Sequence, residues 1–217
     1  LRDPARPTFL YHGRVDRRKG ALDTVDAFAR LVAARAAAGS TAPPRLVVSG
    51  IGPDVDAVRA RVAAHALEAH VHLAGAAAYD DVPAVYHTAD AFVSPTYAEG
   101  FSNTILEAMA SGLPTIGGRA VGVVDCLRDG ENGLLVTPGD VAALAAAMAR
   151  LLDDAPLRAR LAATALAEVR ATYAWPVAVQ QIVGEYRRVI GTRPDVAWTP
   201  VTVRDLSCRF RAAPHLL

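Results

Sequence analysis

The stretch TFLYHGRVDRRKGALDTVDAFARLVAARAAAGSTAPPRLVVSG, residues 8–50, decides the fold of this chain. It opens with an apolar run at 8–13, which ends at a glycine and indicates a buried strand. Residues 21–39 then space their apolar side chains at helical intervals and end at Gly39, which predicts a helix. A short loop leads to a second apolar run at 45–50. The order strand, helix, strand predicts two parallel strands joined by a crossover helix.

The same alternation continues along the chain. Further helices are predicted at 54–69, 80–89, 102–112, 139–152, 154–173 and 175–190. Further strands are predicted at 70–75, 90–95, 113–118 and 133–138. Apolar strands separated by helices predict a parallel sheet that is covered on both faces. We therefore expect an α/β fold: a doubly wound, Rossmann-like parallel sheet of about six strands with helices on both faces.

The length of 217 residues suits one large domain. The alternation of strand and helix patterns ends near Arg193. We therefore expect residues 1–192 to form one Rossmann-like domain and residues 193–217 to form a C-terminal tail.

Composition narrows the classes of partner. The chain is 52% hydrophobic and 21% charged, which is typical of a globular protein. Its formal net charge is only +1, so we expect no nucleic-acid partner. Cys126 and Cys208 lie far apart and form no CxxC pair, which favours a reducing, cytoplasmic setting. No apolar stretch is long enough to predict a transmembrane helix.

Ligands of doubly wound folds bind beyond the carboxyl ends of the strands, so the loops at that edge carry the candidate residues. The first loop reads GRVDRRKG, residues 13–20. Arg14 offers a fork of donors and Lys19 a point charge, and both suit phosphate oxygens. The start of the following helix adds oriented N–H groups. The alternative interpretation is an ordinary solvated basic loop.

The second loop, SGIGPD at 49–54, contains Gly50 and Gly52. This spacing suggests close approach of the backbone to a ligand, or a tight structural turn. Val55 stands where a dinucleotide fingerprint has its third glycine, which argues against a nicotinamide cofactor. Asp54 and Asp56 match the D-x-D pattern of metal-dependent sugar transfer. They begin a helix, however, so we interpret them as capping residues and predict no metal site.

A third loop leads into the stretch TYAEGFSNTILEAMASG, residues 96–112. Ser102 or Asn103 is predicted to cap the helix, which leaves first-turn N–H groups free for an anion. Glu99 lies in the loop and Glu107 about one and a half turns inside the helix, so the two are not neighbours on one helix face.

A carboxylate can accept hydrogen bonds from two neighbouring hydroxyl groups. Two carboxylates beside a phosphate-binding helix end would suit a nucleotide sugar, because one could hold the sugar and the other the ribose. The alternative is a surface Glu99 and a Glu107 that pairs with a neighbouring arginine.

Residues 13–20, SPTYAEGFSNTILEAMASGLPTI at 94–116 and GENGLLVTPGD at 130–140 together resemble a known family. They are similar to the donor-binding half of retaining glycosyltransferases of group 1, or family 4, and the resemblance extends over roughly residues 8–190. It implies one half of a GT-B fold, in which two Rossmann-like domains face each other across a cleft. The C-terminal domain of that fold binds the nucleotide sugar, so the resemblance implies that residues 1–192 form a nucleotide-sugar-binding, Rossmann-like domain.

The resemblance also implies residue roles. Arg14 and Lys19 would contact the diphosphate and offset the charge of the leaving group. Glu99 would hold hydroxyl groups of the transferred sugar, Glu107 would hold the ribose, and the backbone at 72–75 would meet the base. The remaining expected donor contacts are Gly13, Gly50, Gly52, Gly75, Gly100, Phe101, Ser102, Asn103 and Thr104.

The activity implied is transfer of a hexose from a UDP- or GDP-sugar to an acceptor hydroxyl group, with retention and without metal or cofactor. The chain opens on the linker-like run LRDPARP rather than on Met. We therefore expect an acceptor-binding domain before residue 1, through which any peripheral membrane contact would be made. Alone, the chain would bind donor and transfer little or nothing.

Three alternatives remain open. They are a non-catalytic module that binds a nucleotide sugar, a sugar-nucleotide epimerase with the GT-B fold, and a phosphorylase. The phosphorylase would need a cofactor lysine, for which the sequence offers no suitable context.

Overall fold

The computed structural model describes residues 6–40 and 42–192. It divides the chain after residue 174 into two compact units, which are described separately here. The predicted tail, residues 193–217, lies outside the described residues. The predicted domain, residues 1–192, spans the first unit and the described helix of the second, and its boundary stays a prediction.

The first unit is built on a six-stranded sheet whose strands are all parallel. The strands are β1 (Thr8–His12), β2 (Arg45–Ser49), β3 (Val71–Gly75), β4 (Ala91–Ser94), β5 (Thr115–Gly118) and β6 (Leu134–Val136). Their order in the sheet is β3-β2-β1-β4-β5-β6. The predicted doubly wound sheet of about six strands is therefore confirmed, and its direction of winding reverses between β1 and β4.

Helices lie between most of the strands and after the last one, as the sequence predicts. They are α1 (Ala21–Ala37), α2 (Val55–Ala64), α3 (Val82–His87), α4 (Asn103–Ala110), α5 (Val141–Asp153) and α6 (Ala155–Glu168). Short 3₁₀ turns precede α1 and α3, at Arg17–Lys19 and Tyr79–Asp81, and α6 continues as a π-helix over Val169–Tyr173. Most of these helices are a few residues shorter than their apolar patterns, because the flanking residues form caps and turns.

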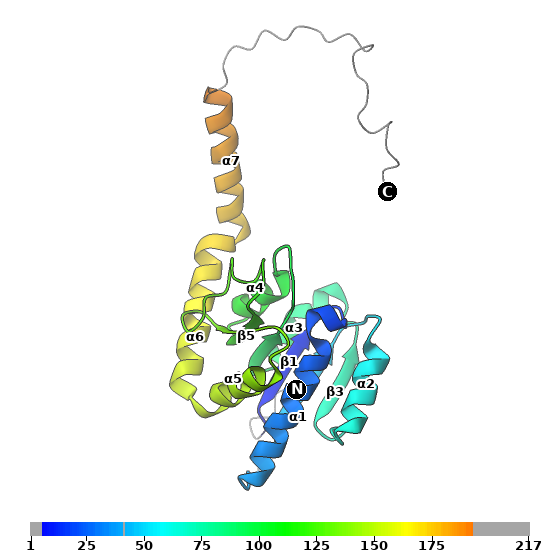
Figure 1. Cartoon of the computed structure of the whole chain (residues 1–217). Helices are drawn as coiled ribbons and strands as arrows, with labels where there is room; N and C mark the ends of the chain where they lie inside the picture. Colours follow the sequence, from blue (N-terminus) through cyan, green and yellow to red (C-terminus); the bar gives the residue numbers. More distant parts are fainter. Residues whose placement is uncertain (1–5, 41, 193–217) are drawn as a thin grey trace, which may run out of the picture. The chain divides into compact units, whose positions relative to one another are not determined.

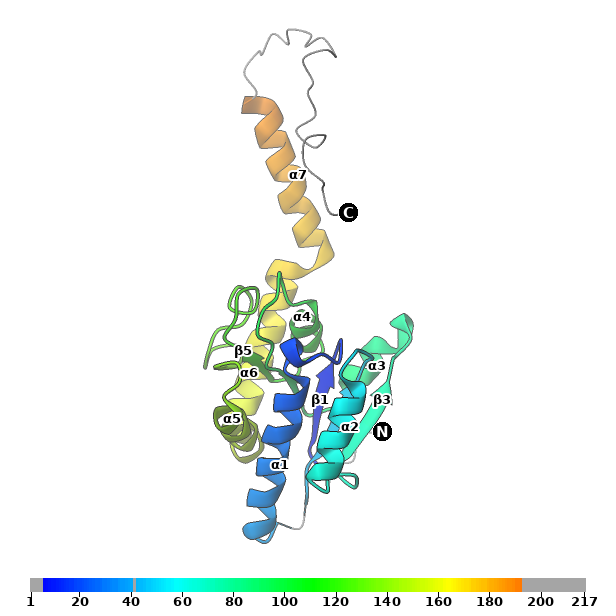
Figure 2. The same ribbon diagram turned by 45° about the vertical axis from the view of Figure 1, so that its right-hand side comes forward.

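Helices cover both faces of the sheet (Figures 1 and 2). Apolar residues of the strands alternate between the two faces, and each face has its own core. Phe9 and Tyr11 of β1 point into the core that α1, α2 and α5 cover. Leu10 points into the opposite core, where α3 and α4 pack. Both faces are thus buried, as the near-continuous apolar strands require. The strand ends carry the loops of the candidate site to one edge.

Aspartate side chains cap the starts of α5 and α6. Asp140 accepts a hydrogen bond from the Ala143 backbone N–H at 2.8 Å, at the start of α5. Asp154 accepts one from the Leu157 N–H at 2.8 Å, at the start of α6. Each carboxylate satisfies a donor that has no partner inside its helix.

The second unit is described through α7 (Trp175–Thr192), a helix in which no residue is buried. None of the helices in the described part of the chain is long and apolar enough to span a bilayer. Cys126 is a free, buried thiol whose burial raises its pKa to about 11, which favours the protonated form at neutral pH. The cytoplasmic setting stays a prediction.

Candidate functional site

The candidate site lies where the winding of the sheet reverses, at the carboxyl ends of β1 and β4. These neighbouring strands pair through Phe9 with Ala91 and Leu10 with Phe92. The loop at 13–20 leaves β1 toward α1, and the loop at 95–102 leaves β4 toward α4. The two loops therefore begin side by side and lead to opposite faces of the sheet, which opens a crevice between them.

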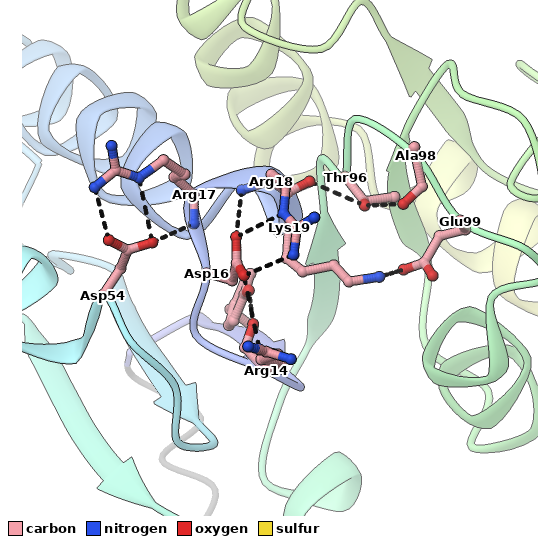
Figure 3. A network of polar contacts seen from close by, with 10 residues as sticks. Arg14, Asp16, Arg17, Arg18, Lys19, Asp54, Thr96, Ala98 and Glu99 are labelled. Atoms are coloured by element: carbon pink, nitrogen blue, oxygen red, sulfur yellow. Dashed lines mark hydrogen bonds and ion pairs between the residues drawn. The ribbon is translucent and has the colours of Figure 1, made fainter. Parts of the chain in front are cut away.

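The loop at 13–20 is held in place by two carboxylates (Figure 3). Asp16 accepts a hydrogen bond from the Arg18 N–H at 2.8 Å. Asp54 accepts the Arg17 N–H at 2.7 Å and also the Arg17 guanidinium at 3.0 Å. These hydrogen bonds lower the pKa of both carboxyl groups, because they stabilise the charged form. The backbone of the loop is thus fixed, while the side chains of Arg14, Arg17 and Arg18 are largely exposed.

The capping role predicted for Asp54 is wrong. Asp54 stands at the N-cap position of α2, but its side chain makes no capping hydrogen bond. Its carboxylate is turned to Arg17 of the neighbouring loop instead. Asp56, in the first turn of α2, pairs with Arg59 at 2.6 Å. Both carboxylates of the D-x-D pattern are therefore engaged with arginines.

The glycines of the second loop have a structural reason. Gly50 and Gly52 let the β2–α2 loop pack directly on the backbone of residues 13–15, and a Cβ at either position would collide with the Gly13 or Val15 carbonyl group. Gly50 also adopts a φ of +139°, which strains other residues. The tight-turn alternative thus holds for both glycines, and their contact with a ligand stays a prediction.

The loop at 95–102 is fixed on both of its sides. The Tyr97 N–H donates to the Arg18 carbonyl at 2.9 Å, which ties it to the loop after β1. On the other side, the Glu99 N–H donates to Val121 at 3.2 Å and the Ser102 N–H to Gly122 at 3.3 Å. Backbone hydrogen bonds at both flanks position the Glu99 side chain at the crevice.

Lys19 and Glu99 meet across the crevice (Figure 3). The Lys19 Nζ atom lies 2.7 Å from Glu99 Oε1, and the side chains are only 33% and 17% exposed. Lys19 is the single lysine in the printed sequence, whose other basic residues are all arginines or histidines. An ammonium group is a compact point charge that can be shared between several oxygens, whereas a guanidinium group needs a planar fork of acceptors.

A cavity of about 220 Å³ lies beside this ion pair. Its lining residues are Tyr11, His12, Gly13, Arg14, Lys19, Ser94, Glu99, Phe101, Ser102, Asn103 and Thr104. We call it the crevice cavity. The structure thus brings together most of the predicted residues; Gly100 lies between two lining residues in the chain. The Arg14 side chain is 63% exposed and pairs with Asp16 at 3.6 Å, so its guanidinium is accessible.

The start of α4 points into the crevice cavity. Ser102 occupies the N-cap position, as predicted, but its side chain makes no capping hydrogen bond. Among the described residues, no acceptor is bound by the N–H groups of Asn103, Thr104 and Ile105. Free N–H groups at a helix start attract anions, and Lys19 and Arg14 add positive charge beside them.

Glu107 lies in different surroundings from Glu99. Its Oε2 atom accepts a hydrogen bond of 2.7 Å from the hydroxyl group of Tyr86, a residue of α3 that is 1% exposed. Glu107 and Tyr86 line a second cavity of about 520 Å³, together with Tyr79, Asp80, Val82, Pro83, His87, Ala110 and Ser111. The alternative of a Glu107–arginine pair is not observed among the described residues. Burial raises the pKa of Tyr86, and the hydrogen bond to Glu107 raises it further.

A third cavity, of about 620 Å³, links the other two. It shares His12, Gly13 and Arg14 with the crevice cavity and Tyr79 and Val82 with the cavity at Glu107. Gly50 and Gly52 also line it. We call it the linking cavity. The two glutamates therefore line different members of a series of three adjoining cavities along the sheet edge. Gly75 lines a smaller cavity of about 100 Å³, which shares Gly50 and Ile51 with the linking cavity. The contact of Gly75 with a ligand stays a prediction.

Sequence reasoning assigned no role to two residues of this edge, His12 and Tyr86. His12 ends β1 and lines two of the cavities. Tyr86 reaches Glu107 from a different helix. His12 directly precedes Gly13, the first residue of the candidate ligand-binding loop, and this position is the only feature of the sequence that indicates His12 as a site residue. Nothing in the local sequence indicates Tyr86, because its contact depends on how α3 packs on α4.

Within the described residues, no group of three or more His, Cys, Asp or Glu side chains is arranged to hold a metal ion.

Comparison with known proteins adds independent information. The sequence profile described as glycosyl transferases group 1 matches residues 1–167. The α-D-kanosaminyltransferase of Streptomyces kanamyceticus is 29% identical over 184 residues, which cover 85% of this chain and 46% of that protein. The chain thus spans about half the length of the curated relatives it matches.

Solved structures agree with the fold. The sucrose-phosphate synthase of Thermosynechococcus elongatus superposes with a TM-score of 0.75 at 29% identity, over 87% of this chain and 47% of that one. Anabaena HepE, solved in complex with UDP-glucose, superposes with a TM-score of 0.72 at 23% identity, over 84% of this chain and 49% of its own.

Proposed function

Because this chain belongs to the group 1 glycosyl transferase family, we propose that it binds a nucleoside diphosphate sugar along the carboxyl edge of its sheet. The sugar is a hexose, which is then transferred to a hydroxyl group of an acceptor. The series of three cavities supports an elongated ligand with several chemically distinct parts. The Anabaena relative was solved with such a molecule.

The diphosphate occupies the crevice cavity in this proposal. Lys19, the accessible guanidinium of Arg14 and the free N–H groups at the start of α4 all border that cavity. The three groups differ in geometry but share positive charge or positive dipole ends, and a diphosphate offers several oxygens to satisfy them. Gly13 places the backbone beside the ligand, and Phe101 closes the cavity with a partly exposed ring.

The two glutamates bind different parts of the donor in this proposal. Glu99, in the crevice cavity, holds hydroxyl groups of the transferred hexose. Glu107 holds the ribose hydroxyl groups with the oxygen that Tyr86 leaves free. The Tyr86 ring lies 5.3 Å from the His12 ring, which places Glu107 near the junction of the crevice cavity and the linking cavity. The base then lies in the linking cavity, near Gly50, Gly52 and Tyr79. The choice between uracil and guanine depends on contacts in that cavity.

The transfer breaks the bond between the anomeric carbon and an oxygen of the β-phosphate. The acceptor oxygen bonds to the same carbon on the same face, and its proton passes to the departing β-phosphate oxygen. Negative charge develops on the departing phosphate, so the cations and N–H dipoles that bind the ground state bind the transition state more strongly. Arg14 and Lys19 supply this charge in place of a metal ion or cofactor.

Transfer itself requires an acceptor-binding half, because the chain covers about half the length of its relatives. The 217 residues alone bind donor and transfer little or nothing. The phosphorylase alternative lacks support, because the single lysine of these residues is already paired with Glu99.

The single observation that carries the proposal is the Lys19–Glu99 pair beside the open start of α4. Its test is a thermal shift of this chain with UDP, GDP and ADP, followed by the corresponding hexose conjugates. A ligand that binds the native state raises Tm, by an amount that grows with the ratio of concentration to Kd. No shift at millimolar concentration of any of these ligands would rule out donor binding.

The single lysine permits a second test. An amine-selective acetylating reagent should modify only Lys19 and the chain's amino terminus. A donor at millimolar concentration should protect Lys19 and leave the terminus unprotected, which mass spectrometry of peptides would resolve. Equal modification with and without donor would place the ligand elsewhere.

A further inference from the structure

His12 stands at the junction of two cavities. It lines the crevice cavity with Lys19 and Glu99, and it lines the linking cavity with Gly50 and Tyr79. In the proposed function these cavities hold the diphosphate and the base. A side chain at their boundary therefore faces the segment between them, where the phosphates join the ribose.

The ring of His12 is held in a defined orientation. Its Nδ1 atom lies 3.0 Å from the Ser49 hydroxyl oxygen on β2. The ring also meets the Tyr86 ring in a T-shaped arrangement, with centroids 5.3 Å apart and planes at 64°. Tyr86 is itself fixed by its hydrogen bond to Glu107. An oriented ring loses little further freedom when it binds a ligand.

The second ring nitrogen is available. Among the described residues, Nε2 of His12 has no hydrogen-bond partner, and it is not among the buried polar atoms that lack one. A polar atom at a cavity wall that is neither buried nor partnered can bind a ligand atom without breaking an existing contact.

Charged and titratable groups surround the ring from several elements. Glu107 approaches from α4 and Tyr86 from α3, while Arg14, Lys19 and Glu99 border the crevice cavity and Tyr79 the linking cavity. Burial lowers the pKa of His12 from its ordinary value, and the charge of Glu107 acts in the opposite direction. His12 is therefore largely neutral at neutral pH, with a carboxylate near enough to favour its charged form.

We propose that His12 is a donor-binding residue, whose Nε2 atom contacts the phosphate–ribose junction of the nucleotide sugar and takes up a proton as the donor binds. The inference rests on the proposed function and adds a residue and a proton to it. The negative phosphates, together with Glu107, stabilise the imidazolium form in the complex. Neutral imidazole, by contrast, prevails in the free protein.

The sign of the resulting pH dependence is fixed by linkage. The donor raises the pKa of His12 on binding, so the complex binds more protons than the free protein. Affinity is highest below the free-state pKa, and it falls as pH rises through the window between the free-state and bound-state values. A shift of one unit corresponds to a tenfold change in Kd.

The test is calorimetric titration of the chain with UDP-glucose and with GDP-mannose between about pH 5.5 and 8.5, a range that brackets the ordinary pKa of histidine. In both probes each phosphate has one ester bond and one anhydride bond, so neither phosphate titrates in this range, unlike the terminal phosphate of UDP. At about pH 6.5 the titration is repeated in buffers of different ionisation enthalpy, which counts the protons taken up. We expect net proton uptake and a Kd that rises about tenfold across the range.

His12→Asn and His12→Gln keep a polar side chain but cannot take up a proton. Both should bind with the weaker Kd of the wild-type chain at high pH, and their Kd should not depend on pH through this window. His65→Asn is the matched control. His65 follows the far end of α2, where it contacts Asp26 at 2.8 Å, and its replacement should leave the pH dependence intact.

The outcomes separate the two proposals. Donor binding with no proton uptake, or pH dependence that persists in both His12 variants, would overturn the role of His12 and leave donor binding standing. Absence of binding by either probe to the wild-type chain would overturn both. The wild-type titration needs no substitution, so it decides the question even where a variant fails to fold.

Discussion

The Lys19 ammonium group and the Glu99 carboxylate form an ion pair of 2.7 Å between the loops that follow β1 and β4. The pair joins the two loops at the point where the winding of the sheet reverses. It also fixes the distance between a cation suited to phosphate and a carboxylate suited to hydroxyl groups. A nucleotide sugar places these two kinds of group next to each other, at the bond that breaks in transfer.

Removal of the cation should weaken donor binding. We expect Lys19→Met to raise the Kd for UDP-glucose or GDP-mannose roughly tenfold to a hundredfold, because hydrogen bonds to charged groups contribute about 1.5–3 kcal/mol. The variant also leaves the Glu99 carboxylate partly buried without its partner. Calorimetric titration measures the change.

The control for Lys19→Met removes a cation elsewhere. Arg35 near the end of α1 pairs with Asp153 of α5, remote from the crevice. Arg35→Met should leave the Kd unchanged within about twofold, since exposed ion pairs contribute little. An equal loss in both variants would mean that Lys19 acts through general charge and not through contact.

Tyr86 should act on the nucleoside end of the donor. Tyr86→Phe removes the hydrogen bond of 2.7 Å to Glu107, so the carboxylate loses its fixed orientation. We expect the Kd for UDP or GDP to rise about fivefold while that for pyrophosphate stays unchanged, because one hydrogen bond contributes about 1 kcal/mol. Titration with each ligand gives the comparison, and equal losses for nucleotide and pyrophosphate would separate Glu107 from the ribose.

Tyr173→Phe provides the comparison for Tyr86→Phe. The Tyr173 hydroxyl donates to the Asp125 carbonyl at 3.4 Å, a long contact at the exposed surface. Its removal should leave both affinities unchanged. Each variant loses a single hydroxyl oxygen. A difference between their Kd values therefore depends on the position of the hydroxyl group and not on the loss of polarity.

The fold could be predicted from the sequence because its signal is local. Apolar runs of strand length and apolar spacing of helix period locate each element within a few residues, and parallel strands follow from their alternation with helices. The order of the strands in the sheet is not local. It places β4 beside β1, which brings together loops about eighty residues apart in the sequence.

The candidate site was predicted as a set of residues, but its internal contacts were not. The family resemblance supplied Lys19 and Glu99, whereas their ion pair depends on the fold. Asp54 was misinterpreted as a cap because local rules favour aspartate before a helix, while Arg17 competes for the same carboxylate through the packing of a neighbouring loop. Glu99 and Glu107 line different cavities, and this separation likewise depends on how the loops and helices pack.

Gly122 should prove essential to the position of Glu99. It adopts a φ of +77°, and a Cβ there would lie 2.5 Å from the Glu99 carbonyl oxygen. We expect Gly122→Ala to lower Tm and raise the donor Kd at least about tenfold, because the collision displaces the loop as well as straining the backbone. Thermal unfolding and titration measure the two effects.

Gly39 is the matched control for Gly122. It has a similar φ of +70°, but no heavy atom lies within 4 Å of its added Cβ. Gly39→Ala should therefore incur only the backbone strain of about 1–2 kcal/mol and leave the donor Kd unchanged. A loss of affinity in Gly39→Ala equal to that in Gly122→Ala would show that reduced stability alone weakens binding.

Asp54 should contribute stability that disappears in acid. Its pKa is lowered by the hydrogen bonds from Arg17, so the charged form is favoured in the folded state. A group with a depressed folded-state pKa stabilises the fold above its unfolded-state value, which is about 3.9 for Asp, and the contribution is lost as pH falls toward the folded-state value. The Tm of the Asp54→Asn variant should therefore lie below that of the wild type at about pH 7, and the difference should shrink between about pH 4 and pH 3. A Tm difference that stays constant across this acid range would show that the substitution acts through packing and that the charge of Asp54 does not hold the loop.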